Sequence, residues 1–316
     1  MNEPKYRVEQ FSTAVQLMEH LSPLNPIWQN GNYIFRGQSS DRYKLTPSIC
    51  RRGPGAFVEN IPRRTTSDSS LSQIATELDV LALFLDGCDR SGLTVPGYSA
   101  HVKRNFATIR SDIASKREPW PHPDLYEILA VAQHYDVPTR LLDWTTRSFV
   151  ACYFAASSAN FLYDELGNIT VWALDLNYSE QWKTVNIIMP PGGTSKNQAA
   201  QSGLFTAHQV QNISMSEVYV PEALEEVDEI YETPTDWIRL IKMTLPLQEA
   251  PSLLHLCSEF GVNGSTLFPG FHGASKMVRD WAKVSVGVRP SSARINKMLS
   301  DAAFGETNVG VFSDDS

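Results

Sequence analysis

One segment of the chain concentrates most of the side chains that could do chemistry. It runs from Gln133 to Thr146 and reads QHYDVPTRLLDWTT, so a His, two Asp, an Arg and several hydroxyl groups surround a proline. The apolar residues Leu141, Leu142 and Trp144 stand among them, and buried polar groups must be hydrogen-bonded or paired. The segment therefore predicts either a structural lock or part of a functional site.

Three side chains of this segment have both a structural and a chemical interpretation. His134 falls at the expected end of a helix, where the helix dipole alone favours a histidine. As a general base it would need a hydroxyl or a water within hydrogen-bond reach. Arg140 and Asp143 stand three residues apart, and we expect them to form an ion pair that locks the turn.

A second arginine, Arg36, follows a strand-like aromatic run. Its guanidinium offers a planar fork that suits phosphate or carboxylate. The adjacent Gly37 lets another backbone or a ligand approach closely. The structural alternative is that Arg36 pairs with a buried carboxylate such as Asp143.

Three hydroxyl residues and a later Gln and His are further candidates for residues of the functional site. Thr145, Thr146 and Ser148 begin an expected helix, whose free N–H groups favour an anion, although a threonine there would also serve as a helix cap. Gln201 and His208 flank a Gly-Leu-Phe run without metal-ligand spacing. The sequence contains no P-loop, Rossmann, HExxH or GxSxG motif, and we expect no metal.

Hydrophobic periodicity predicts the elements that position these residues. Helices are expected from Ser70 to Gly87, over 100–113, from Asp124 to His134, over 149–156 and over 252–260. Strands are expected over 33–37, 169–174 and 237–247. Helices grouped between separated strands favour an α+β fold, with a mixed or antiparallel sheet core flanked by helices. We predict one domain over 1–304, in which 51–120 is a loop plus a helical insertion, and a loose polar tail over 305–316.

Composition and charge narrow the class of protein. The chain has 316 residues, of which 42% are hydrophobic and 20% charged, as in soluble globular proteins. The net charge of −8 is uneven, because residues 1–158 hold 17 Lys and Arg against 16 Asp and Glu, and the remainder holds 10 against 19. Broad binding to nucleic acid is disfavoured. We expect it only through the basic loop that contains Arg51, Arg52, Arg63 and Arg64.

Cysteine usage and apolar runs predict the compartment. The four cysteines are far apart and form no CxxC pair, the longest apolar run is too short to cross a membrane, and the first residues lack a secretory signal. We expect a reduced, cytoplasmic protein that has no structural zinc and does not bind a membrane.

The motifs of the chain resemble those of the FRG-domain family. Residues 35–39 (FRGQS) look like its name-giving motif, and 133–145, running on into 151–155, looks like its longest motif. Two later family blocks are matched by 201–208 (QSGLFTAH) and 266–270 (TLFPG). Together these motifs span about residues 33 to 280. The sequence departs from the family pattern at Asp136, where Gly is usual, and at 270–272, where acidic residues are usual.

A second resemblance is to ADP-ribosyltransferases of the arginine–serine–glutamate type. These carry an aromatic-Arg-Gly run on the first core strand and a Ser-Thr-Ser-like segment that leads into a helix, and 35–37 and 145–155 are similar in that order. The resemblance implies an ADP-ribosyltransferase-like core with NAD as the ligand. On the hypothesis of such a core, we predict catalytic roles for Arg36, Gln201 and His134, and cofactor contacts for Arg36, Gly37, Arg140, Thr145, Thr146 and Ser148.

The third element of that family, its catalytic Glu, has Gln201 as its nearest positional counterpart. A Gln can hold a ribose hydroxyl but lacks the negative charge that stabilises an oxocarbenium-like transition state. Three alternatives stay open: Gln201 serves a slower or different reaction, a Glu such as Glu217 reaches in, or the pocket binds a nucleotide without cleaving it.

The leading hypothesis is an NAD- or nucleotide-binding protein that acts as an ADP-ribosyltransferase or NAD-cleaving effector. Its setting would be bacterial or phage conflict, as toxin or phage defence, by analogy. A non-enzymatic alternative is a nucleotide sensor or a scaffold for a protein partner. A further alternative is a metal-independent ribonuclease, with His134 and His208 as acid and base.

Overall fold

The protein is described by a computed structural model. It covers residues 5–29, 32–53, 56–61, 69–115, 117–160, 167–191, 196–210, 213–214, 218, 221–232 and 238–287. The expected tail over 305–316 lies outside these ranges. Among the described residues, no helix combines the length and the apolar character needed to cross a membrane.

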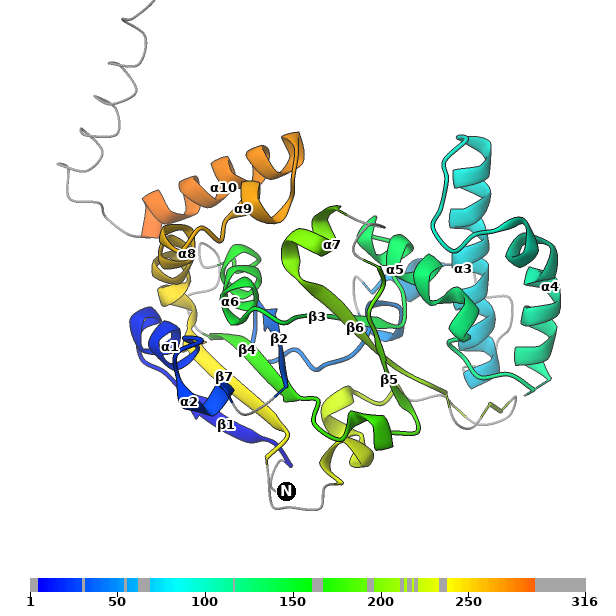
Figure 1. Cartoon of the computed structure of the whole chain (residues 1–316), viewed down its shortest axis with the longest axis horizontal. Coiled ribbons are helices and arrows are strands. Elements are labelled where there is room, and N and C mark those ends of the chain that lie inside the picture. The colour runs from blue at the N-terminus through cyan, green and yellow to red at the C-terminus, as the bar shows by residue number, and fades with distance from the viewer. Residues whose placement is uncertain are drawn as a thin grey trace, which may run out of the picture.

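A seven-stranded mixed sheet forms the centre of the molecule (Figure 1). Its strand order is β1-β7-β4-β2-β3-β6-β5; β1 pairs in parallel with β7, and the other neighbours are antiparallel. The strands are β1 (Arg7–Gln10), β2 (Tyr33–Gln38), β3 (Leu141–Thr145), β4 (Asn168–Asp175), β5 (Val185–Ile188), β6 (Gly203–His208) and β7 (Leu240–Pro246).

The helices flank this sheet in two groups (Figure 1). They are α1 (Ala14–His20), α2 (Pro26–Gln29), α3 (Ser70–Arg90), α4 (Ala100–Ala114), α5 (Tyr126–His134), α6 (Ser148–Ser157), α7 (Lys196–Gln201), α8 (Ala250–Glu259), α9 (Gly264–Leu267) and α10 (Phe271–Gly287). The prediction of an α+β fold with a mixed sheet flanked by helices is confirmed.

The central strands are buried on both faces. Along β4, Val171 and Ala173 enter the hydrophobic cluster beneath α6, whereas Trp172 and Leu174 enter a second cluster on the opposite face. This division follows from the two-residue period of a strand. Both faces are covered, so these strands are almost continuously apolar, as in sheets that carry layers on both sides.

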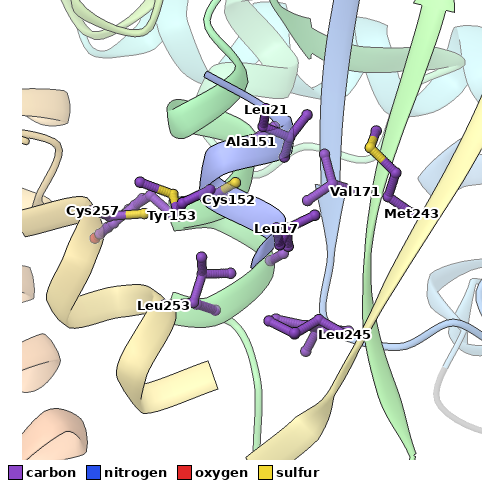
Figure 2. Packing of buried hydrophobic residues seen from close by; sticks show 14 of the residues in the cluster. Leu17, Leu21, Ala151, Cys152, Tyr153, Val171, Met243, Leu245, Leu253 and Cys257 are labelled. Carbon is purple, nitrogen blue, oxygen red and sulfur yellow. The ribbon is translucent and has the colours of Figure 1, made fainter. Parts of the chain in front are cut away.

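Helix α6 lies at the centre of the first cluster, between the sheet and helices α1 and α8 (Figure 2). It is apolar around its whole circumference, the pattern of a fully buried helix. Cys152 on α6 and Cys257 on α8 are buried there, and burial raises the pKa of both thiols. These cysteines therefore act as packing residues rather than as reactive thiolates.

Gly37 determines how closely β2 approaches α6. A Cβ at this position would lie 2.0 Å from the carbonyl oxygen of Ala151 and 2.6 Å from the backbone nitrogen of Ala155. The close approach expected at this glycine is therefore the backbone of a helix. This contact sets the distance between β2, which carries Arg36, and the middle of α6.

Strands β2 and β3 are paired at only one position. β2 pairs with β4 along its whole length, but with β3 it is registered only where Phe35 faces Thr145. The carbonyl oxygen of Asp143 accepts a hydrogen bond from the Arg36 side chain, at 2.7 Å from Nη1. A side chain thus satisfies a strand carbonyl beside the poorly paired edge, and residues of both strands line an open cavity there.

The described part of the segment 51–120 contains the helices α3 and α4. Helix α3 begins one residue after its N-cap Ser69 and extends to Arg90, so the expected stop at Gly87 is wrong. Cys88, in the last turn, is buried with α4 and α5 in a third hydrophobic cluster. This packing outweighs the low helix propensity of a single glycine.

Candidate functional site

An open cavity of about 860 Å³ lies where β2, β3 and α6 meet α5, α7 and the start of α10. It contains side chains of both charges together with several aromatic rings. Its polar and aromatic lining comprises Phe35, Arg36, Ser48, Gln133, His134, Tyr135, Asp136, Asp143, Trp144, Thr145, Tyr153, Phe154, Ser157, Ser158, Asn197, Gln201, Phe268, His272 and Lys276.

Arg36 is the most deeply placed cation of this cavity. Its side chain is 13% exposed, and Nη1 lies 3.5 Å from Asp143 Oδ2. Within the described residues, its Nε is buried without a hydrogen-bond partner. Burial lowers the pKa of Arg36 more than Asp143 raises it, and the positive charge of Arg51 lowers it further. A guanidinium stays protonated even so, and this one therefore carries a charge that its surroundings compensate incompletely.

Asp143 is held in place from two sides. Its Oδ2 accepts a hydrogen bond from Gln133 Nε2 at 2.8 Å, in addition to its contact with Arg36. Gln133 is fixed in turn, because its amide oxygen accepts from the Thr139 hydroxyl and its nitrogen also donates to the Leu141 carbonyl. The expected pairing of Arg36 with Asp143 is present, but the carboxylate faces the cavity with 57% of its side chain exposed.

His134 ends α5 and faces the cavity beside Tyr135. Its Nε2 lies 3.2 Å from the side-chain amide nitrogen of Asn197 on α7. Burial lowers the pKa of His134, and the carboxylates of Asp136 and Asp143 oppose this effect. The imidazole is therefore predominantly neutral near pH 7 and can accept or donate one hydrogen bond to a bound molecule.

The backbone of the turn after His134 explains why Asp136 can stand where the family motif usually has Gly. Asp136 has a φ of +62°, in the left-handed region that glycine enters freely and that Asp and Asn tolerate better than most residues. The Gly that is usual at this position would suit the same turn. The departure at Asp136 therefore preserves the backbone path that brings His134 back toward β3.

Thr145 and Gln201 are joined at the far end of β3. The Thr145 hydroxyl donates to the Gln201 carbonyl oxygen at 2.7 Å and accepts from the backbone N–H of Arg147 at 3.1 Å. The Gln201 side chain donates to the Leu267 carbonyl at 3.1 Å. Gln201 lines the cavity, but this hydrogen bond ties its amide nitrogen to the α9 segment.

An aromatic wall from the C-terminal helices covers one side of the cavity. The Phe268 ring lies 6.1 Å from that of Phe154 and 5.8 Å from that of His272, both edge-on, and Lys276 Nζ stands 4.7 Å from its centre. Sequence reasoning assigned these residues no role in the site. The available signal was the 266–270 block, which resembles a family motif without revealing which cavity it lines.

Three predicted contact residues lie elsewhere. Arg140 is 4% exposed and forms a buried ion pair with Glu77 of α3, so the expected lock between Arg140 and Asp143 is wrong. In extended chain, the side chains of residues three apart point to opposite sides.

Ser148 and Thr146 do not line the cavity either. Ser148 is buried, and its hydroxyl donates to the Leu21 carbonyl at 2.7 Å, whereas Thr146 is exposed to solvent. Helix α6 has Arg147 as its N-cap without a side-chain cap, which corrects the expected threonine cap.

Comparison with known proteins identifies part of the chain. The family model described as the FRG domain matches residues 31–162. The chain contains an FRG domain. The match contains both the Arg36 motif and the segment from Gln133 to Thr146. Neither the curated proteins nor the solved structures provided a significant match, so the resemblance to ADP-ribosyltransferases stays a prediction.

The cavity extends beyond the matched part of the FRG domain. Residues 31–162 supply its β2, α5, β3 and α6 walls, and residues after 196 supply α7, Phe268 and the start of α10. Glu217, the other carboxylate that the sequence offered, lies outside the described residues, as do Arg63 and Arg64 of the basic loop. Among the described residues, no three His, Cys, Asp or Glu side chains are grouped so as to hold a metal ion.

Proposed function

We propose that the cavity of this FRG-domain protein binds NAD or a related nucleotide and cleaves it as an ADP-ribosyltransferase-like effector. The observation that carries the proposal is Arg36 at the wall of an 860 Å³ cavity: its side chain is 13% exposed, and its buried Nε has no hydrogen-bond partner among the described residues. A buried donor without a partner is costly, and a phosphate oxygen would satisfy it. The volume lies within the usual range of ligand sites.

The distribution of cations favours a ligand with more than one phosphate. Arg36 lies inside the cavity, and Arg51 is close enough for its charge to lower the Arg36 pKa. Arg51 is exposed, and its Nε donates to the Thr46 carbonyl at 3.2 Å. Arg51 does not line the cavity itself, so a diphosphate would meet both guanidinium groups only if its second phosphate extended beyond the cavity wall.

The remaining walls suit a base and a sugar. Phe154 and Phe268 present apolar ring surface on which a nucleobase or nicotinamide can pack. His134 and Asn197 offer donors and acceptors for ribose hydroxyls. Cleavage would deplete cellular NAD or modify a partner, which is consistent with the effector role in bacterial or phage conflict that the sequence suggested.

The same cavity bears on two alternative functions, a nucleotide sensor and a ribonuclease. A sensor that binds the nucleotide without cleaving it is supported by Gln201, whose amide nitrogen donates to Leu267. The ribonuclease hypothesis has less support. His208 is at the end of β6 nearest Arg140, 3.9 Å from Glu222, and does not line the cavity with His134.

The test is NAD binding by calorimetry together with nicotinamide release, with and without cell extract. Wild type is compared with Arg36→Ala and with Arg42→Ala, which removes an exposed arginine elsewhere. We expect binding and release that are lost only in Arg36→Ala. Binding without release would favour the sensor, and the absence of both from the folded wild type would contradict the proposal.

A further inference from the structure

Asp143 stands out among the residues of β3. The other four residues of the strand are buried, whereas Asp143 is exposed and lines the cavity. It lies between Arg36, which we assign to phosphate, and Gln133 of the α5 wall. A carboxylate here places negative charge against any sugar bound beyond the phosphates.

The hydrogen bonds of Asp143 leave one carboxylate oxygen available. Oδ2 faces Gln133 Nε2 at 2.8 Å and Arg36 Nη1 at 3.5 Å, and the backbone carbonyl accepts from the same Nη1 at 2.7 Å. Within the described part of the chain, Oδ1 has no hydrogen-bond partner. The side chain is thus oriented by two fixed donors, with one oxygen free to meet a ligand.

Gln201 cannot supply this charge, because an amide is neutral and its nitrogen is tied to Leu267. The other aspartate of the cavity, Asp136, is exposed in the turn after α5; its backbone N–H donates to the Gln133 carbonyl at 3.1 Å, but its carboxylate makes no hydrogen bond with the Arg36 or Gln133 side chain. The two aspartates therefore differ in one respect that matters here: only Asp143 is held by donors inside the cavity.

We propose that Asp143 is the catalytic carboxylate of this cavity and acts on the N-glycosidic bond of a nicotinamide nucleotide. This inference rests on the proposed function. When the bond between ribose C1′ and the pyridinium nitrogen breaks, its electron pair goes to that nitrogen and neutral nicotinamide leaves. The positive charge that develops on the ribose is stabilised by the fixed carboxylate. Water then adds to C1′, and its proton passes to Asp143 Oδ1 and on to solvent.

The test replaces each aspartate by its neutral isostere. Asp143→Asn keeps an oxygen that can accept from Gln133 and Arg36, so we expect it to fold and to bind NAD with an affinity within about threefold of wild type. Its kcat for nicotinamide release should fall by about 100-fold or more with little change in KM. Asp136→Asn removes the same charge from the same cavity and tolerates the left-handed turn, and its loss of nicotinamide release should be at least about tenfold smaller than that of Asp143→Asn.

The outcomes separate the two claims. Release by Asp143→Asn within about tenfold of wild type, or an equal loss in Asp136→Asn, would overturn the role of Asp143 while leaving NAD cleavage intact. A wild type that binds NAD without releasing nicotinamide would also overturn it, but would preserve nucleotide binding. A wild type that binds no NAD would refute the proposed function itself.

Discussion

Two arginines from the FRG domain illustrate two uses of the same side chain. Arg140 lies against α3, where Glu77 takes two of its nitrogens, and both partners are almost completely buried. Arg36 lies at the cavity, where Asp143 is half-exposed and Nε has no partner among the described residues. One guanidinium is enclosed by its own chain, and the other keeps a donor available. The comparison indicates that a structural arginine differs from a ligand-binding one less in its burial than in how many of its guanidinium nitrogens have partners within the chain.

The enclosed region is a network rather than a single pair. Glu77 also accepts hydrogen bonds from Trp120 Nε1 at 2.7 Å and Gln73 Nε2 at 2.8 Å. These partners come from α3, from the chain before α5 and from the residue just before β3, so the network ties α3 to the sheet. The cavity region differs, because Arg36 Nε has no hydrogen-bond partner among the described residues and the Asp143 carboxylate is exposed.

The largest effect is expected when the enclosed pair is broken. Arg140→Ala leaves Glu77 as an uncompensated buried charge, and we expect the free energy of unfolding to fall by about 3–5 kcal/mol. Glu77→Ala should cost a similar amount, and the double variant less than the sum of the two. Urea denaturation measures all three. A loss below about 1 kcal/mol in both single variants would remove the distinction between the two arginines.

A smaller effect is expected at the turn that joins the two regions. Asp136→Val places a β-branched residue at a φ of +62°, and we expect a cost of about 1–2 kcal/mol in unfolding free energy. Asp136→Gly should be as stable as wild type or slightly more so. If thermal denaturation ranks the valine variant above the glycine variant, the left-handed turn does not hold in solution.

The smallest effect is expected on the pH dependence of stability. Burial lowers the pKa of His134 below its ordinary value of 6.5, so the unfolded chain takes up a proton at a pH where the folded chain does not. The free energy of unfolding therefore decreases as the pH falls below about 6.5, the pKa of His134 in the unfolded chain. The decrease is complete once the pH is below the lower pKa of His134 in the folded chain. His134→Asn should flatten this decline. His101→Asn, an exposed position on α4, should leave it unchanged, and identical pH profiles for wild type and His134→Asn would contradict the assignment.

Local sequence patterns predict the elements of this fold well where hydrophobic periodicity is strong. The long helix from Ser70, the strand over 169–174 and the helix that ends at His134 all appear near their expected positions. The α10 helix was not predicted, although it is amphipathic. The end of α3 was misplaced because Gly87 is compensated by packing of the following turn.

The site was only partly predictable, because its contacts are long-range. Arg36, His134, Thr145 and Gln201 all line the cavity, as a shared site would require. Ser148 does not, because its hydroxyl meets the Leu21 carbonyl, 127 residues away in sequence. The ion pair between Glu77 and Arg140 was missed for the same reason: the two residues are 63 positions apart, so no local sequence pattern indicates that they meet. Phe268 and Lys276 enter from the C-terminal helices, which a single sequence cannot place against β2.

The central claim is that Arg36 grips the phosphates of a nucleotide. Titration calorimetry of NAD into wild type and Arg36→Lys tests it most directly, with unfolding free energies measured in parallel. Lysine keeps the charge beside Asp143 but loses the planar fork. We predict that wild type binds NAD and that Arg36→Lys binds at least about tenfold more weakly, at a stability within about 1 kcal/mol of wild type. Wild-type affinity in the folded Arg36→Lys variant would contradict the account.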